Sequence, residues 1–192
     1  MNTKDKILES GLKLFSKKGY LGATTREIAK AAGIAEITLF RYFPSKEKLF
    51  EEVIHTNLFL PALRGLLPEI AELSYEEGLR IIAKRFLDFL AERKDLVRIM
   101  HSEIHRYNEK IHKIYHSIID EIFKTLASYF TEMQKKEILR TFDTELGARA
   151  FLGMLFSYFD AENFLMLKKY KCTDTNTVIK EFVVIFIKGT AK

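Results

Sequence analysis

Hydrophobic residues recur at helical spacing from close to the start of the chain. Ile7, Leu8, Leu12 and Phe15 fall on one face of a helix over residues 3–18. Residues 182–187 (FVVIFI) also have the composition of a strand, but no second strand is available to pair with them, and a lone strand is unstable. We therefore predict an all-α protein, with helices over residues 3–18, 24–32, 35–42, 46–59, 75–93, 95–107, 109–130, 134–140, 143–169 and 175–188.

Residues 24–43 (TTREIAKAAGIAEITLFRYF) carry the signals of two short helices joined by a tight turn. Thr24 and Glu27 have the spacing of a capping box, which starts a helix. Gly33 stands where the chain turns sharply, a conformation that glycine adopts at little cost. Pro44 ends the second helix. This is the layout of a helix-turn-helix, whose second helix enters the DNA major groove.

The later part of the chain contains signs of a domain junction and of pairing. Pro61 and Pro68 bracket a short segment that we interpret as the junction between domains.

The helices predicted at 143–169 and 175–188 are apolar on more than one face, which is typical of helices buried on two sides. They either lie centrally in a monomer or pair with a second copy in a four-helix bundle. We favour a homodimer because two-fold DNA readers require pairing.

Composition excludes several classes of protein. The hydrophobic content of 47% is sufficient for a core, and three prolines and nine glycines do not indicate disorder. The longest apolar run, 182–187, is too short to span a bilayer, so no membrane association is predicted. The first residues lack a secretory signal, and the single Cys172 fits a reducing compartment, so we predict a cytoplasmic protein. Cys172 is either an idle thiol or a redox sensor.

Positive charge is concentrated at the start of the chain. Residues 1–50 hold ten basic and five acidic residues, a surplus equal to the formal net charge of +5 of the whole chain. The remaining residues are therefore balanced. Such asymmetry indicates a polyanionic partner for this segment, although a solvated helical face would give the same composition.

A combined pattern runs through residues 3 to about 55. Its main parts are Ile7-Leu8, Leu12 with Phe15, Gly19-Tyr20, Thr24-Thr25-Arg26-Glu27-Ile28-Ala29, Ala32-Gly33-Ile34, Thr38-Leu39-Phe40, Tyr42-Phe43 and Lys46. Taken as a whole, this pattern resembles the TetR family of bacterial transcriptional regulators. The combination is specific, whereas any single fragment of it is not.

The resemblance implies a DNA-binding domain of three helices over residues 1–50 and a helical effector-binding and dimerisation domain over residues 51–192. It implies a homodimeric repressor on a palindromic operator in double-stranded DNA. A small molecule would enter the second domain, shift the helix at residues 46–59 and separate the two DNA-binding heads. No cofactor is implied. The family's DNA-contacting positions fall on Thr25, Arg26, Ala35, Glu36, Ile37, Thr38, Phe40, Arg41, Tyr42 and Lys46.

Three of these positions distinguish this chain. Phe40 stands where the family usually has tyrosine, so one phosphate-seeking hydroxyl is absent. Tyr42 stands where histidine is common, and its hydroxyl is suited to the same contact. Glu36 is unusual on a surface facing DNA. It either accepts a hydrogen bond from a cytosine amino group or only favours the start of its helix.

Aromatic residues beyond residue 75 are candidates for an effector pocket. Aromatic side chains at helical spacing are usually core, but pockets between helices are also lined by them. An aromatic pocket would suit a small lipophilic ligand. The candidate ligand-binding residues are Phe86, Phe89, Tyr107, Tyr115, Phe123, Phe151, Tyr158 and Phe159.

Two other functions remain open at the level of sequence. Histidines at i and i+4 can bind a transition metal, so a metal-responsive regulator using His101, His105, His112 and His116 is one alternative. An effector-independent architectural DNA-binding protein is the other. Ordinary surface histidines are the favoured interpretation, and no metal is predicted. The HSEIH sequence lacks the glutamate position of the zinc-protease motif, and no other catalytic motif is present, so we do not predict an enzyme.

Overall fold

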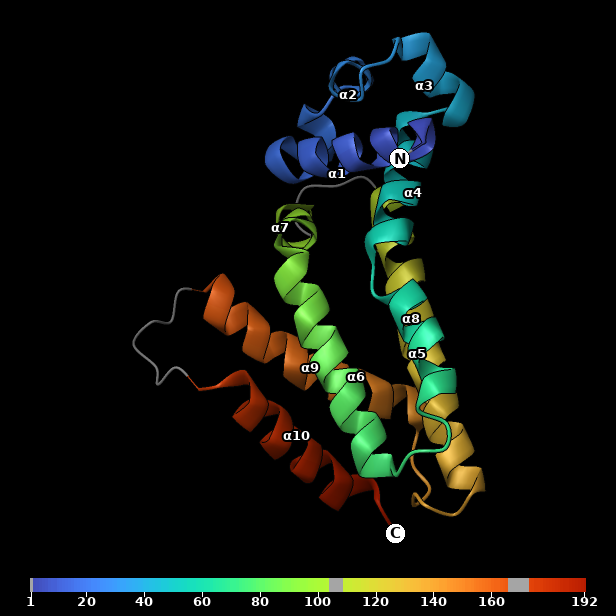
Figure 1. Cartoon of the computed structure of the whole chain (residues 1–192), viewed down its shortest axis with the longest axis vertical. Helices are drawn as coiled ribbons and strands as arrows, with labels where there is room; N and C mark the ends of the chain where they lie inside the picture. Colours follow the sequence, from blue (N-terminus) through green and yellow to red (C-terminus); the bar gives the residue numbers. More distant parts are fainter. Residues whose placement is uncertain (1, 104–108, 166–172) are drawn as a thin grey trace. The chain divides into compact units, whose positions relative to one another are not determined.

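The computed structural model describes residues 2–103, 109–165 and 173–192. Within these residues the regular elements are α-helices, as the hydrophobic periodicity predicts, and the one β-like feature is an isolated bridge between Leu139 and Ala191 (Figure 1). The helices are α1 (Thr3–Gly22), α2 (Thr25–Ala31), α3 (Glu36–Tyr42), α4 (Lys46–Asn57), α5 (Leu60–Glu69), α6 (Tyr75–Glu92), α7 (Lys94–Glu103), α8 (Glu109–Lys135), α9 (Thr144–Asn163) and α10 (Thr175–Thr190).

The chain forms two compact units, and neither is continuous in sequence. The first unit contains Met1–Leu58 and Arg93–Ile118. The second contains Phe59–Glu92 and Ile119–Lys192. The predicted functional division near residue 50 therefore lies inside α4 of the first unit, and as a statement about function it stays a prediction.

α1 begins and breaks where its sequence predicts. The Asn2 side chain accepts a hydrogen bond from the Asp5 amide at 2.9 Å, and the Asp5 carboxylate accepts one from the Asn2 amide at 3.1 Å. This reciprocal capping satisfies two amides at the start of the helix. Gly19 has φ 71° and interrupts the helix, in agreement with a predicted end near residue 18. A last helical turn then runs to Gly22.

The core of the first unit is built from aromatic side chains and from α7. The rings of Phe15 and Phe50 meet edge to face with centroids 4.9 Å apart, and Tyr115 lies 5.8 Å from Phe50. α7 packs against α1, and its Leu96 and Val97 are buried. Full burial of each such large apolar side chain contributes roughly 1.5–3 kcal/mol, so α7 is part of what stabilises the amino-terminal helices.

In the second unit, α6, α9 and α10 pack against one another (Figure 1). The same unit contains a cluster of phenylalanines. The Phe186 ring lies 4.9 Å from Phe151 and 5.5 Å from Phe130. A buried polar contact joins α6 to α10, where the Tyr75 and Thr190 hydroxyls are 3.1 Å apart. Thr190 donates its own proton to the Phe186 carbonyl at 2.7 Å, so Tyr75 is the donor between the two hydroxyls.

The sequence pattern gave no helix between residues 60 and 74, and this prediction is wrong. α5 occupies Leu60–Glu69, with Pro61 in its first turn, where a missing amide hydrogen costs nothing. Pro68 lies in the last turn of the same helix. The first point at which the chain passes from one unit to the other falls directly before α5, between Leu58 and Phe59.

The prediction of a separate short helix at 134–140 is also wrong, because the structure has no helix of its own there. α8 ends at Lys135, five residues later than predicted, and Glu137 follows in the left-handed region with φ 59°. The Glu137 amide donates to the Gln134 carbonyl, and the Ile138 amide donates to the Met133 carbonyl. This is the Schellman pattern, with glutamate at the position that glycine usually occupies.

α9 and α10 are helices, as predicted. The carboxyl-terminal end of α9 lies earlier in the chain than predicted. α10 is a helix, so the strand interpretation of residues 182–187 is excluded. α9 ends at Asn163, whose side chain donates to the Phe159 carbonyl at 2.8 Å, whereas the prediction extended to residue 169. Among the described helices, none is both long enough and apolar enough to cross a lipid bilayer.

Candidate nucleic-acid interface

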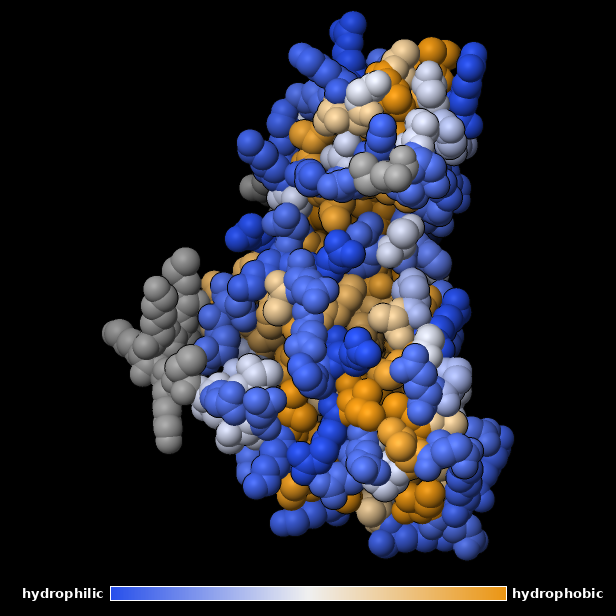
Figure 2. Space-filling view, in the orientation of Figure 1, coloured by the Kyte–Doolittle hydropathy of each residue, from blue (hydrophilic) through white to orange (hydrophobic). Residues whose placement is uncertain are grey.

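α3 is an amphipathic helix with one buried side and one exposed side. Its inward side is fixed by Leu39, which is fully buried, and Phe43 directly after the helix is buried as well. On the outward side, Ile37 is 66% exposed, Phe40 is 40% exposed and Tyr42 is 47% exposed. Figure 2 shows hydrophobic side chains at the surface over α3, among hydrophilic ones. Large apolar side chains at a surface indicate a binding face.

The other predicted contact residues lie around this face with different degrees of exposure. Ala35 is the N-cap of α3 and is exposed, and Thr38 in the first turn is half-buried. Arg26 in α2 and Arg41 in α3 are exposed cations. The first unit therefore brings the predicted residues of α2 and α3 to the surface in one short stretch of chain.

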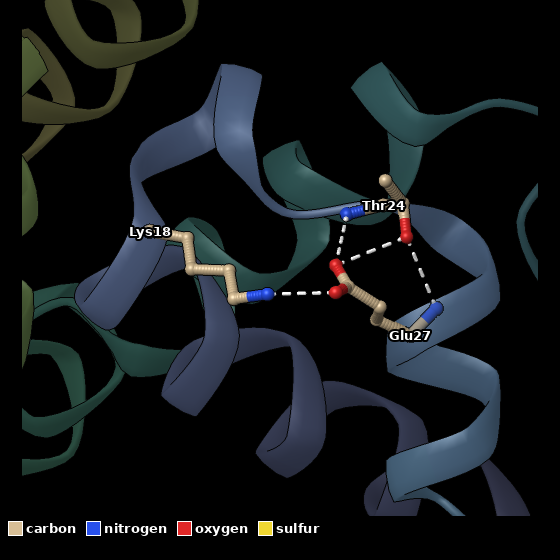
Figure 3. Close-up of polar contacts among 3 residues, drawn as sticks. All are labelled: Lys18, Thr24 and Glu27. Atoms are coloured by element: carbon tan, nitrogen blue, oxygen red, sulfur yellow. Dashed lines mark hydrogen bonds and ion pairs between the residues drawn. The ribbon is translucent and has the colours of Figure 1, made fainter.

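The start of α2 is fixed by a capping box joined to an ion pair (Figure 3). The Thr24 hydroxyl accepts from the Glu27 amide at 3.2 Å, and the Glu27 carboxylate accepts from the Thr24 amide at 3.2 Å. The Lys18 ammonium lies 2.6 Å from the same carboxylate. These contacts, with that of Lys18 the strongest, lower the pKa of Glu27 to about 2. The carboxylate therefore stays ionised and anchors α2 to α1.

A second contact ties α2 to α3. The Thr25 hydroxyl donates a hydrogen bond of 2.7 Å to a carboxylate oxygen of Glu36, eleven residues along the chain. Thr25 is the first residue of α2 and Glu36 is the first residue of α3. Sequence reasoning missed this pair because no local pattern predicts a hydrogen bond across the turn.

Lys46, the first residue of α4, is held against the amino-terminal helix. Its ammonium lies 4.5 Å from the centre of the Tyr20 ring and 3.4 Å from the Leu21 carbonyl oxygen. Burial, together with the nearby Glu47 carboxylate, raises the pKa of the Tyr20 phenol well above its ordinary value. Tyr20 therefore stays neutral and presents an aromatic face to the cation.

The aromatic residues predicted to line an effector pocket are distributed over both units. Tyr115 belongs to the first unit, and Tyr107 lies outside the described residues. In the second unit Phe86 and Phe89 flank the Phe59 ring, with centroids 5.0 Å and 5.5 Å away.

The remaining pocket candidates belong to the second unit and have separate neighbours. Phe151 is buried against Phe186, and Phe159 is buried beside Phe164. The Phe123 ring is covered by the Arg149 guanidinium at 4.8 Å. The Tyr158 hydroxyl donates to the Thr173 carbonyl at 2.9 Å.

Two open grooves run along α5 and α6 in the second unit. The larger has a volume of about 560 Å³ and is lined by apolar residues such as Leu66 and Ile70 and by charged residues such as Arg85 and Asp88. The smaller, of about 350 Å³, is lined in part by Phe89. Phe89 is thus a pocket candidate that lies at a cavity of the described surface.

The histidines do not gather into a metal site in the part of the chain that the structure describes. His112 and His116 stack with ring centroids 6.3 Å apart, and His101 is exposed. His105 and Cys172 lie outside the described residues. Among the described residues, no group of three or more histidine, cysteine or acidic side chains is arranged to hold a metal ion.

Comparison with known sequences supplies the family. Residues 7–53 match the sequence model described as bacterial regulatory proteins, tetR family, and residues 77–189 match that of the AefR-like transcriptional repressor, C-terminal domain. The chain belongs to the TetR family. This TetR-family protein is therefore a DNA-binding transcriptional regulator of the repressor type and not an enzyme.

Relatives of this TetR-family chain agree in sequence and in fold. The uncharacterized HTH-type transcriptional regulator YvkB of Bacillus subtilis is 30% identical over 82% of this chain and 81% of its own length. The crystal structure of a putative TetR-family regulator from Mesorhizobium loti has a TM-score of 0.80 at 22% identity, over 99% of this chain and 97% of the other. A putative fatty acid metabolism regulator from Clostridium perfringens has a TM-score of 0.75 at 27% identity, over 96% and 97%.

Proposed function

We propose that this TetR-family regulator binds a palindromic operator as a homodimer in the cytoplasm, with α3 of each subunit in the major groove. The observation that carries the proposal is the exposed face of α3, on which Ile37, Phe40 and Tyr42 stand out from a helix anchored by the buried Leu39. A helix of this kind fits the major groove, and its first turn reaches base edges. Arg26, Arg41 and Lys46 supply cations for the flanking phosphates.

Pairing through α9 and α10 is supported by what those helices leave exposed. The two helices pack side by side (Figure 1), yet Leu146 on α9 is 63% exposed and Ile185 on α10 is 56% exposed. Ala150, Gly153 and Ser157 continue the exposed side of α9 at helical spacing with small side chains. A second copy that packs against this side would bury the apolar residues and complete a four-helix bundle.

A lipophilic small molecule is the proposed effector, and it binds the helical second part of the chain. The aromatic content of that part supports it, and so does the similarity to the Clostridium perfringens protein, which is described as a putative fatty acid metabolism regulator. We propose a ligand with a long acyl chain that releases the operator.

Selection of bound sequences from a pool of random duplexes tests the DNA-binding proposal. We expect enrichment of a palindrome with half-sites about one helical turn apart, because each subunit presents one α3. Enrichment of a single half-site without symmetry would contradict the dimer, and recovery of no preferred sequence would contradict operator recognition.

The effector proposal has its own measurement. Addition of palmitate or palmitoyl-CoA to the purified protein should raise its melting temperature, because a ligand that binds only the folded state stabilises it. The same compound should lower the affinity for the selected operator. If neither palmitate nor palmitoyl-CoA changes the melting temperature or the operator affinity, the proposal of an acyl-chain effector is contradicted. The DNA-binding proposal would still stand.

A further inference from the structure

The hydrogen bond between Thr25 and Glu36 determines what both side chains can do at a DNA surface. The Thr25 hydroxyl has one proton, and it donates that proton to Oε1 of Glu36 at 2.7 Å. A phosphate oxygen is an acceptor and needs a donor. While the bond to Glu36 persists, the Thr25 side chain has no proton to offer to the DNA backbone.

Glu36 keeps one carboxylate oxygen that no described residue occupies. Its Oε2 atom has no hydrogen-bond partner, and no cation pairs with the carboxylate, within the part of the chain that the structure describes. The residue is half-buried and directly precedes Ile37, which is 66% exposed. The contact with Thr25 occupies one oxygen of the carboxylate, and the side chain as a whole is only partly buried.

A fixed carboxylate can make only one kind of favourable contact with DNA. It repels phosphates, so it cannot position the protein on the backbone. It accepts hydrogen bonds, and the amino donors in the major groove are those of cytosine and adenine. Adenine places its N7 acceptor beside its amino group, where it faces the carboxylate unfavourably. Cytosine carries its N4 donor without a neighbouring acceptor on the same base.

We propose that Thr25 and Glu36 form a cytosine-reading pair, in which Glu36 accepts from the cytosine N4 amino group and Thr25 is the positioning residue. This inference rests on the proposed function, since it names the base read by the same α3 helix. It makes Thr25 an element of specificity rather than a direct contact of the DNA backbone. Arg26, Arg41 and Lys46 keep the phosphate contacts.

Three variants separate this role from a phosphate contact. Glu36→Gln keeps the size of the side chain and adds a donor, and the amide of glutamine matches the adjacent donor and acceptor of adenine. Thr25→Val keeps the shape of threonine and removes the hydroxyl. Thr25→Ser removes the methyl group but keeps the hydroxyl, so it serves as the matched control for Thr25→Val. Thermal melting followed by circular dichroism verifies that each variant protein is folded.

Selection from random duplexes, followed by titration on the selected site and its single-base variants, gives the readout. Wild type should prefer cytosine at one position of each half-site by about fivefold or more, the range of a single specific base contact. Glu36→Gln should shift the preference at that position to adenine. Thr25→Val should reduce the cytosine preference severalfold, and Thr25→Ser should retain it.

The possible failures are distinguishable. If Thr25→Val weakens binding to all duplexes equally and keeps the base profile, Thr25 is a phosphate contact and the inference is wrong. If wild type selects a palindrome in which no position changes preference in Glu36→Gln, Glu36 reads no base and the inference is wrong while the proposed function stands. If wild type selects no sequence at all, the proposed function fails and the inference fails with it.

Discussion

The ammonium group of Lys46 lies 4.5 Å from the centre of the Tyr20 ring, where the first turn of α4 meets the end of α1. The ring restricts the lysine side chain, and the cation stays at the surface of the first unit. A lysine side chain that is already restricted loses less conformational entropy when its ammonium group binds a DNA phosphate. The contact with Tyr20 therefore favours the proposed phosphate contact of Lys46.

Replacement of Lys46 by alanine should weaken binding to every duplex by a similar factor. A phosphate contact carries no base information, so the selected sequence should not change. A plot of log affinity against log salt concentration should lose about one unit of slope. Filter-binding titrations at several salt concentrations give both quantities. Lys13→Ala, which removes an exposed lysine paired with Glu9, is the charge-matched control. A changed base preference in Lys46→Ala would contradict the assignment.

The carboxyl group of Glu27 should titrate far below an ordinary glutamate. Its pKa of about 2 in the folded protein lies below the ordinary value of 4.5, and the Lys18 contact is the largest cause. The stabilisation by ionised Glu27 is therefore complete above about 4.5 and is lost as the pH falls towards 2. Lys18→Met should raise the Glu27 pKa, as followed by NMR titration of the carboxyl carbons.

Glu77 in α6 is the internal control for that titration. The Ser74 hydroxyl and amide lower its pKa without any lysine, so Lys18→Met should leave it unchanged. An unchanged Glu27 midpoint in the variant would show that the ion pair in Figure 3 does not act on the carboxyl.

Gly78 in α6 should not tolerate alanine. A Cβ atom at this position would lie 2.4 Å from the Tyr129 hydroxyl oxygen, which is buried and has no hydrogen-bond partner among the described residues. Overpacking of this kind costs roughly 1–3 kcal/mol and exceeds the gain of about 1 kcal/mol in helix propensity. Chemical denaturation should show Gly78→Ala to be less stable than wild type.

Two further variants make the Gly78 prediction specific. Tyr129→Phe in the Gly78→Ala background should recover much of the loss, because it removes the clashing oxygen. Gly65→Ala in α5, where the added Cβ would meet no described atom within 4 Å apart from its chain neighbours and its own helix backbone, should instead gain up to about 1 kcal/mol. A Gly78→Ala protein as stable as Gly65→Ala would refute the clash.

Charged substitutions on the exposed sides of α9 and α10 should dissociate the proposed homodimer. Leu146→Glu and Ile185→Glu each place a carboxylate where a second copy would bury an apolar side chain, and a buried unpaired charge is strongly unfavourable. Sedimentation velocity should show monomers for both. Ile138→Glu, at an exposed apolar position outside α9 and α10, is the control and should remain dimeric. Unchanged sedimentation of Leu146→Glu and Ile185→Glu would exclude this interface.

The elements that depend on nearby residues were predictable from the sequence. The Thr24 and Glu27 capping box forms as its spacing predicts, and both Gly19 and Gly33 have φ 71° where turns were expected. α10 is helical because its apolar residues follow the helical period, and the described residues contain no strand that could pair with it. Each of these signals lies within a few residues of the feature that it specifies.

The features that were missed depend on contacts between distant residues or on rare choices of residue. Thr25 meets Glu36 only because the turn places the starts of α2 and α3 together. Lys18 reaches Glu27 from a different helix. Glu137 takes a left-handed conformation that a sequence pattern assigns to glycine, so the end of α8 was misplaced. None of these has a periodic signature.

The packing of α7 against α1 sets a condition for building chimaeric regulators. The amino-terminal unit needs Arg93–Ile118 as well as Met1–Leu58, and the buried Leu96 and Val97 of α7 belong to its interior. A chimaera that takes only residues 1–58 of this unit would lack α7, and the apolar surface of α1 that α7 covers would be exposed. On the proposed function, exchange of operator specificity between such proteins therefore works best when the outward residues of α3 are grafted together with Thr25 of α2, and the rest of the unit is left in place.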